Sequence, residues 1–232
     1  MFERIDFMNN GLDCERVTVD GKRFYQTEDG KRYPSITTVI GWSGREKIKQ
    51  WRARVGEKKA NAISSQAARR GTKVHKMCED YVNNKPNFLD GHMPSDVENF
   101  TAIKPDIDKL IGGVYAQEYF MYSDHLGIAG TADCIAMVNG KASIVDFKTS
   151  KKSLVKGGYK LPKYFAQCAG YAVMFEERTG IPVSQLVIIA AVDEKLELFE
   201  HDQAEVYIEK RDDYIDSLKD MIHNYKKDNN LL

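Results

Sequence analysis

Hydrophobic and polar positions repeat with helical spacing in five segments of the chain. Apolar residues recur every three or four positions over 45–68, which predicts a helix. Gly71 interrupts this pattern, and Thr72 is suited to cap a second helix that runs to about Val82. The same criterion predicts helices over roughly 95–111, 161–179 and 202–226.

Runs of β-branched and aromatic residues between turn signals predict the strands. Residues 16–40 read as short strands separated by Asp20-Gly21 and Asp29-Gly30, with Ile36-Thr37-Thr38-Val39 as the last extended stretch. The order helices, strands, helix, strand, helix predicts an α/β fold (α+β, with a mixed sheet) rather than a strict βαβ repeat. Strands are expected at about 114–122, 130–138, 141–149 and 185–193, with a shorter one at 196–200.

The most informative segment is a predicted hairpin over 130–150. Asn139-Gly140 lies between two apolar runs and is the preferred two-residue hairpin turn. Such a turn fixes the register of the two strands, and on that register Asp133 lies directly opposite Asp146. Lys148 follows Asp146 by two residues and therefore projects to the same side of the strand.

Two carboxylates in facing positions have Cβ atoms roughly 4.5–5.5 Å apart and repel each other. The neighbouring residues on both strands are apolar, which favours burial of Asp133 and Asp146 over the alternative of two solvated acids on an exposed ribbon. Buried like charges need a cation or a raised pKa. Mg²⁺ commonly binds one or two carboxylates together with substrate phosphate, so the hairpin predicts a divalent-metal site.

The Asp-x-Lys pattern is uninformative by itself, because the chain contains five Asp/Glu-x-Lys triplets. Only the triplet that begins at Asp146 follows an apolar β-run and has a facing acid across a tight turn. The combination of triplet, hairpin and facing acid therefore carries the prediction.

Composition places the chain among ordinary globular proteins. It has 232 residues, 42% of them hydrophobic, and as many acidic as basic residues. We expect one domain over 1–232, because no low-complexity segment or internal repeat divides it. No window approaches 18 consecutive apolar residues, so no membrane-spanning helix is expected.

The basic residues are concentrated in one segment although the net charge is zero. Residues 45–76 contain eleven Lys and Arg but only two acids, whereas residues 193–232 contain twelve acids and six bases. A basic segment of this kind favours a polyanionic partner. A solvated helix with Trp51 turned into the core is the structural alternative, and for Trp51 itself we favour it.

The four cysteines, Cys14, Cys78, Cys134 and Cys168, form no CxxC pair, so neither a disulfide scaffold nor a zinc knuckle is expected. Free thiols indicate a reducing cytoplasm. The N-terminus carries acids and no apolar run, so a secretory signal is not expected.

Four motifs together resemble the RecB-type nucleases of the PD-(D/E)XK superfamily. They are Gly71-Thr72-Lys73-Val74-His75, Gly130-Thr131-Ala132-Asp133, Asp146-Phe147-Lys148-Thr149, and Gln167 followed by Tyr171. Tyr33-Pro34-Ser35-Ile36-Thr37 before a basic helix further resembles the mitochondrial genome maintenance exonuclease group and its phage relatives. The resemblance covers roughly residues 30–195.

This resemblance implies a restriction-endonuclease-like core with an N-terminal helical elaboration. The expected parts are N-terminal strands over 1–44, a helical wall carrying His75 over 45–112, a catalytic sheet core over 113–200, and a C-terminal helix over 201–232. The implied location is the cytoplasm of a bacterial or phage-infected cell, with a processed mitochondrial form as the alternative.

The resemblance also implies roles for the motif residues. Asp133, Asp146, His75 and the backbone carbonyl of Phe147 would hold Mg²⁺ or Mn²⁺, and Lys148 would stabilise charge and help to activate water. Glu118, in an apolar strand before the hairpin, is a further candidate acid. Glu79, one helical turn after His75, is either a second acid of the site or a solvated ion-pair partner.

The expected substrate is DNA, preferentially single-stranded and entered from a free end. An iron–sulfur cluster is not expected, since no cysteine follows Cys168, and ATP is not expected, since there is no Walker A motif. The alternatives are a structure-selective endonuclease, a non-catalytic nucleic-acid-binding protein on the same fold, and a metal-dependent phosphohydrolase of small substrates. The candidate substrate-binding residues are Tyr164, Gln167, Tyr171, Arg52, Lys58, Lys59, Arg70 and Lys73.

Overall fold

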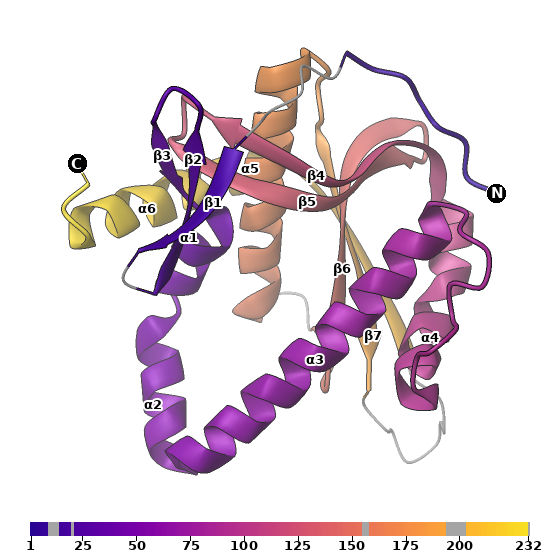
Figure 1. Cartoon of the computed structure of the whole chain (residues 1–232), viewed down its shortest axis with the longest axis horizontal. Helices are drawn as coiled ribbons and strands as arrows, with labels where there is room; N and C mark the ends of the chain where they lie inside the picture. Colours follow the sequence, from indigo (N-terminus) through magenta and orange to yellow (C-terminus); the bar gives the residue numbers. More distant parts are fainter. Residues whose placement is uncertain (9–13, 20, 155–157, 194–202, 232) are drawn as a thin grey trace.

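The computed structural model describes all of the chain except residues 9–13, 20, 155–157, 194–202 and 232. Two sheets and six helices make up the described part (Figure 1). The elements are, in order, β1 (Cys14–Val19), β2 (Lys22–Thr27), β3 (Arg32–Pro34), α1 (Ile36–Trp42), α2 (Arg45–Val55), α3 (Glu57–Val82), α4 (Pro94–Leu110), β4 (Ile111–Ser123), β5 (Ile128–Val138), β6 (Lys141–Ser150), α5 (Lys160–Thr179), β7 (Gln185–Val192), β8 (Gln203–Lys210) and α6 (Asp212–Asp228).

The central sheet has five strands in the order β4-β5-β6-β7-β8. Only the β6–β7 pairing is parallel, and α5 provides the crossover between these two strands. Parallel neighbours need such a crossover, whereas the antiparallel β4–β5 and β5–β6 pairs are joined by short turns. The sheet is therefore mixed, which confirms the predicted fold class.

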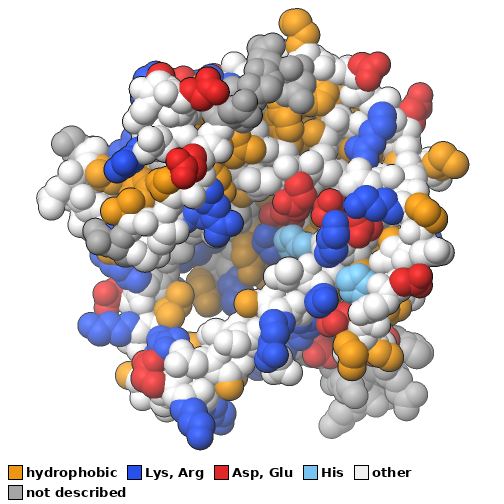
Figure 2. Space-filling model, viewed as in Figure 1, with side chains coloured by type: hydrophobic (Ala, Val, Ile, Leu, Met, Phe, Trp, Pro, Cys, Tyr) orange, Lys and Arg blue, Asp and Glu red, His pale blue; other side chains and the backbone are white. Residues whose placement is uncertain are grey.

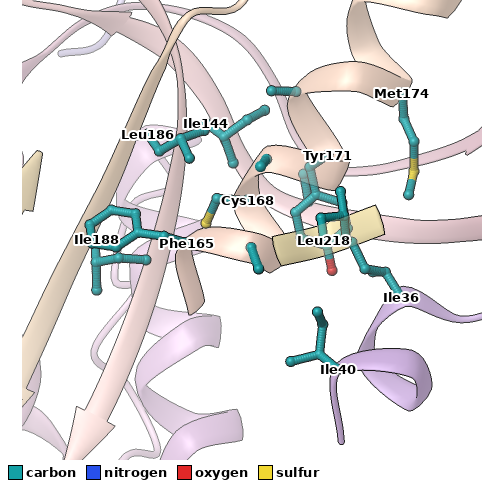
Figure 3. Close-up of a cluster of buried hydrophobic side chains, with 14 of the residues drawn as sticks. Ile36, Ile40, Ile144, Phe165, Cys168, Tyr171, Met174, Leu186, Ile188 and Leu218 are labelled. Atoms are coloured by element: carbon teal, nitrogen blue, oxygen red, sulfur yellow. The ribbon is translucent and has the colours of Figure 1, made fainter. Parts of the chain in front are cut away.

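Helices cover both faces of this sheet, and each face has its own hydrophobic cluster. Side chains of α1, α5 and α6 pack on one face around Ile144, Ile188 and Phe165 (Figure 3). Side chains of α3 and α4 pack on the other face around Val145 and Phe147. Consecutive residues of β6 thus point to opposite clusters, as the period of a strand requires.

The segment between the small sheet and the central sheet projects away from the core. Helices α2 and α3 form a V, and the α3 limb runs across the central sheet to α4 (Figure 1). No residue of α2 is buried, and the first half of α3 buries only Ala60. We refer to residues 45–70 as the arm.

Three expectations about local structure were wrong. Ile36–Trp42 is helical rather than extended, because the Ser35 hydroxyl caps it by accepting a hydrogen bond from the Thr38 backbone N–H. The break in the long basic segment lies at Gly56 rather than at Gly71. Gly56 has φ +84°, a conformation that favours glycine, whereas Gly71 continues the helix.

The third error concerns the C-terminal region, where a helix over 202–226 was expected. Residues 203–210 instead form β8, which pairs with β7, and the helix begins only at Asp212. This edge strand therefore belongs to the central sheet, and the C-terminal helix is shorter than the predicted 201–232 segment. The predicted short strand at 196–200 lies outside the described residues.

Candidate active site

The β5–β6 hairpin brings the predicted acid pair together at the point where its two strands diverge. The predicted register is confirmed from Val138 opposite Lys141 to Cys134 opposite Val145. One step further, backbone pairing stops and the Asp133 carboxylate takes its place. Asp133 Oδ2 accepts a hydrogen bond of 3.0 Å from the backbone N–H of Phe147. The carboxylate thus lies between the two strands.

Asp146 and Lys148 are adjacent on the same side of β6, as predicted. The Asp146 side chain is 2% exposed and forms an ion pair with Lys148 Nζ. Lys148 Nζ also lies 5.0 Å from the centre of the Tyr164 ring, so α5 holds the ammonium group from the other side. Asp146 Oδ2 is buried and accepts no hydrogen bond of normal geometry from the described residues.

Helix α3 carries His75 to this point from the other face of the sheet. His75 Nδ1 lies 3.3 Å from Asp133 Oδ2. Gly71, one turn earlier on α3, lies over β6, where a Cβ atom would be 3.8 Å from Thr149 Oγ1. The predicted grouping of His75, Asp133, Asp146 and Lys148 is therefore present in the structure.

The electrostatics of these four side chains follow from burial and mutual contact. Burial, opposed in part by Lys148, raises the pKa of Asp146 to about 6 from its usual 3.8. Burial also opposes ionisation of Asp133, but the neighbouring His75 and Lys148 outweigh it, so the pKa of Asp133 is lowered. For the same reason the carboxylates overcome burial and raise the pKa of both His75 and Lys148. The two acids are thus held in different environments.

The chemistry of the donors fits a hard divalent cation. Two carboxylates, an imidazole and the Phe147 carbonyl supply oxygen and nitrogen ligands. Among the described residues, no three acidic, histidine or cysteine side chains already converge as a preformed ligand set. In this structure His75 and Lys148 occupy the carboxylate oxygens, so metal binding would require them to reorient.

Glu118 lies on β4 beside Asp133. The pairs Gln117–Cys134 and Tyr119–Ala132 flank it, which places Glu118 across from Asp133. Its φ of +45° is unusual for a residue with a side chain, and burial together with the Asp133 charge raises its pKa to about 7. The structure therefore brings this candidate acid next to the site.

Glu79 lies on the same side of α3 as His75 but has an ion-pair partner of its own. Its Oε2 is 3.0 Å from Lys76 Nζ, which also lies 3.0 Å from Asp80. This contact matches the alternative reading of Glu79 as an ion-pair partner on a helix.

Helix α5 borders the site with the other residues that the motifs single out. Gln167 donates a hydrogen bond of 2.9 Å from Nε2 to the Tyr171 hydroxyl, and its Nε2 is 3.4 Å from Thr37 Oγ1. The Tyr171 ring packs on Gly130, where a Cβ would lie only 2.8 Å from the ring. Gly130 is thus required by the close approach of α5, three residues before Asp133.

The basic candidates are spread over different surfaces. Lys58 and Lys59 are exposed on the arm, as expected. Arg52 instead connects α2 to α3 across Gly56, because it binds Glu57 and Asn61 of α3. We refer to this bend of the arm at Gly56 as the elbow. Trp51 is half-buried and lies outside the hydrophobic clusters, so the expectation that it joins the core was wrong.

Arg70 and Lys73 do not face the acid pair. A helix turns by about 100° per residue, so both point away from His75 by more than a quarter turn. They line a separate cleft of about 630 Å³ between α3, α4 and the ends of β6 and β7, which also contains Lys151 and Asp193. Within it Arg70 Nη1 lies 3.3 Å from Asp193. None of His75, Asp133, Asp146 or Lys148 lines this cleft.

Sequence reasoning missed two features near the site. Thr37 contacts Gln167 across 130 positions, and Lys47 lies close to Tyr159 and Lys163 across more than 110. No local pattern signals such contacts, because they depend on where α1 and α2 pack against α5.

Comparisons with known proteins add one distant relationship. No protein-family model matches the chain. It is 26% identical over 139 residues to mitochondrial genome maintenance exonuclease 1 of Mus musculus, and the match covers 56% of this chain and 41% of the mouse protein. The matched region therefore spans about two fifths of that relative. This similarity suggests a relationship to a nuclease.

A solved structure also resembles the chain, but weakly. The crystal structure of SSO0001 gives a TM-score of 0.33 at 12% identity, over 76% of this chain and 70% of that chain. A TM-score this low does not establish a common fold. None of the helices in the described part of the chain is both long and apolar enough to cross a bilayer.

Proposed function

We propose that this chain is a divalent-metal-dependent nuclease of the PD-(D/E)XK type that hydrolyses phosphodiester bonds in DNA. The observation that carries the proposal is the pairing of the half-buried Asp133 with the buried Asp146 and with Lys148 at the divergent end of the hairpin. The similarity to a mitochondrial exonuclease supports the same reaction class. Replication, repair or recombination of DNA is the setting in which such an activity would act.

Asp133, Asp146, His75 and the Phe147 carbonyl are the proposed ligands for Mg²⁺ or Mn²⁺. A bound divalent cation would supply charge neutralisation at the scissile phosphate and lower the pKa of water. Lys148 would provide a positive charge beside that phosphate, because the Tyr164 ring holds its ammonium group near the two carboxylates. Glu118, with its pKa near neutrality, would be the residue able to accept a proton at the edge of the site.

The proposed substrate form is single-stranded DNA, entered from a free end. Figure 2 shows that this face of the molecule is hollowed between the arm and the central sheet, with Lys and Arg side chains around the hollow. A duplex is wide and stiff, whereas a single strand is flexible enough to pass beneath α3. Exposed Lys58 and Lys59 would contact the backbone of the strand without reading its sequence.

The contacts of the remaining substrate-binding candidates bear on their roles. Tyr171 is buried and its hydroxyl accepts a hydrogen bond from Gln167, so we propose that Tyr171 orients Gln167 and that Gln167 positions the strand beside Lys148. Arg70 and Lys73 would contact DNA only beyond α3, in the separate cleft that they line.

The experiment that tests the proposal is a cleavage assay with four end-labelled or closed substrates. The purified chain is incubated with Mg²⁺ or Mn²⁺ and with linear single-stranded DNA, circular single-stranded DNA, blunt duplex and single-stranded RNA. We expect metal-dependent cleavage that is fastest on linear single-stranded DNA. Cleavage of circles at the linear rate would indicate the endonuclease alternative, and faster cleavage of RNA would assign a different substrate.

A further inference from the structure

An exposed tyrosine between two lysines lies where the arm approaches the start of α5. Tyr159 immediately precedes α5 and is 53% exposed, which is unusual for so large a ring. Lys47 Nζ of α2 lies 4.7 Å from the centre of this ring, and Lys163 Nζ lies 5.7 Å from it. These three residues, Lys47, Tyr159 and Lys163, are called the tyrosine clamp.

The positive charges of the clamp are not balanced by acids. Among the described residues, no carboxylate forms an ion pair with Lys47 or Lys163. Burial and the nearby Lys47 charge lower the pKa of Lys163. Most other cations near tyrosine rings in this structure do have an acid, as Lys104 has Asp108.

The backbone adds to the same positive field. A Cβ on Gly44 would lie 2.9 Å from Lys163 Nζ, so this lysine passes close to the residue at which α2 begins. The N-terminal end of a helix carries the positive end of its dipole. Two lysines and a helix N-terminus thus meet beside an exposed aromatic ring, and the acid nearest to them in sequence is Glu46 in the first turn of α2.

The clamp is also close to the candidate active site along α5. Lys163 is adjacent in sequence to Tyr164, whose ring contacts Lys148. Tyr159 precedes Tyr164 by five residues, which corresponds to a rise of roughly 7.5 Å and a rotation of about 140° on a helix. The two tyrosines are therefore near each other along α5 but point to different sides of it.

We propose that the clamp binds a nucleotide of single-stranded DNA on the approach to the candidate active site, with its base stacked on Tyr159 and its flanking phosphates held by Lys47 and Lys163. This inference rests on the proposed nuclease function and adds a specific base-stacking site to it. Stacking on an aromatic ring tolerates any base, so the clamp confers affinity for unpaired nucleotides without sequence preference. In a duplex the same base is paired and stacked on its neighbours, and the clamp therefore discriminates against double strands.

The test is fluorescence anisotropy of two labelled oligonucleotides in EDTA, where no cleavage occurs. One probe is oligo-dT, and the other has the same length but abasic sites throughout. We expect Tyr159→Ala to raise the Kd for oligo-dT about tenfold and to leave the Kd for the abasic strand unchanged. Tyr159→Trp should restore wild-type affinity, and the exposed ring predicts that neither variant changes the Tm.

The lysines are tested by salt dependence. Lys47→Gln combined with Lys163→Gln should weaken binding of both probes and reduce the slope of log K against log salt by about 1.4, since each contact on a single strand contributes about 0.7. Lys219→Gln, on the exposed surface of α6, is the matched control and should have no effect.

The outcomes separate this inference from the proposed function. If the wild-type chain cleaves and binds single-stranded DNA but Tyr159→Ala affects both probes equally or not at all, the clamp is refuted and the nuclease assignment stands. If the wild-type chain neither binds nor cleaves DNA, both are refuted.

Discussion

The divergent end of the β5–β6 hairpin and the arm differ in how their charges are held. At the hairpin, Asp133, Asp146, His75 and Lys148 are largely withdrawn from water and satisfy one another within a packed core. On the arm, α2 buries no residue, and Lys58 and Lys59 point into solvent. Fixed buried charges suit chemistry at one atom, whereas exposed charges on a weakly packed element suit contacts with a long polyanion.

This difference separates the consequences of mutation. Changes at the hairpin should alter the chemical step, and changes on the arm should alter affinity for the strand. The two regions should therefore respond to mutation independently of each other.

The largest effect is expected for Lys148→Ala. Removing the charge beside the scissile phosphate should lower kcat by about 10²-fold or more, with a smaller change in KM. Single-turnover cleavage of labelled single-stranded DNA measures this, with Lys219→Ala as a control for the loss of one surface lysine. A rise in KM alone would show that Lys148 binds substrate rather than stabilising charge.

The next effect is expected from reversing charge on the arm. Lys58→Glu with Lys59→Glu should weaken binding of single-stranded DNA about tenfold in low salt and leave kcat at saturating DNA unchanged. The weakening should be the same for strands of different sequence and should fade as salt is raised. A fall in kcat at saturation would mean that the arm takes part in the chemistry.

A smaller effect is expected at the elbow of the arm. Gly56 has φ +84°, so Gly56→Ala strains the backbone, although a Cβ there meets no atom within 4 Å. We expect the free energy of unfolding in urea to fall by about 1 kcal/mol. Gly41→Ala is the matched control, because Gly41 is helical with equally open surroundings and alanine should be neutral or stabilising there. Equal effects of the two changes would contradict a strained elbow.

The smallest effect concerns the stability of the metal-free protein. Because burial raises the pKa of Asp146 to about 6 from its usual 3.8, the folded state keeps a proton between these pH values that the unfolded state has lost. Stability should therefore decrease as pH rises from about 4 to 6 and remain lower above 6. In EDTA, Asp146→Asn should remove this part of the pH dependence and raise the Tm at pH 7.5 by roughly 5 °C. An unchanged pH profile in the variant would show that Asp146 is not the responsible group.

The hairpin could be predicted from sequence because its determinants are local. Asn139-Gly140 fixes the turn, alternation fixes the faces, and the register follows from both. The prediction failed only at the last step, where Asp133 replaces backbone pairing with a side-chain hydrogen bond to Phe147. Divergence of strands depends on the path of β5 toward β4, which no local signal describes.

Elsewhere the errors come from contacts that are distant in sequence. Gly71 resembles a helix breaker, yet it stays helical where α3 crosses Thr149 of β6. Strand β8 was assigned to a helix because its pairing with β7 is invisible in its own sequence. The direction in which the Lys73 side chain points can, by contrast, be predicted from the sequence. Lys73 precedes His75 by two residues, and two residues on a helix correspond to a rotation of about 200°.

The central claim is that the acid pair of the hairpin holds a divalent cation, and Mn²⁺ binding followed by isothermal titration calorimetry tests it most directly. We predict saturable binding to the wild-type chain, loss of that binding in Asp133→Ala and Asp146→Asn, and no change in Asp216→Asn, which alters an exposed acid of α6. The same two hairpin variants should lose cleavage while retaining their fold. Undiminished Mn²⁺ binding by both variants, or full cleavage by the wild-type chain in excess EDTA, would contradict the account.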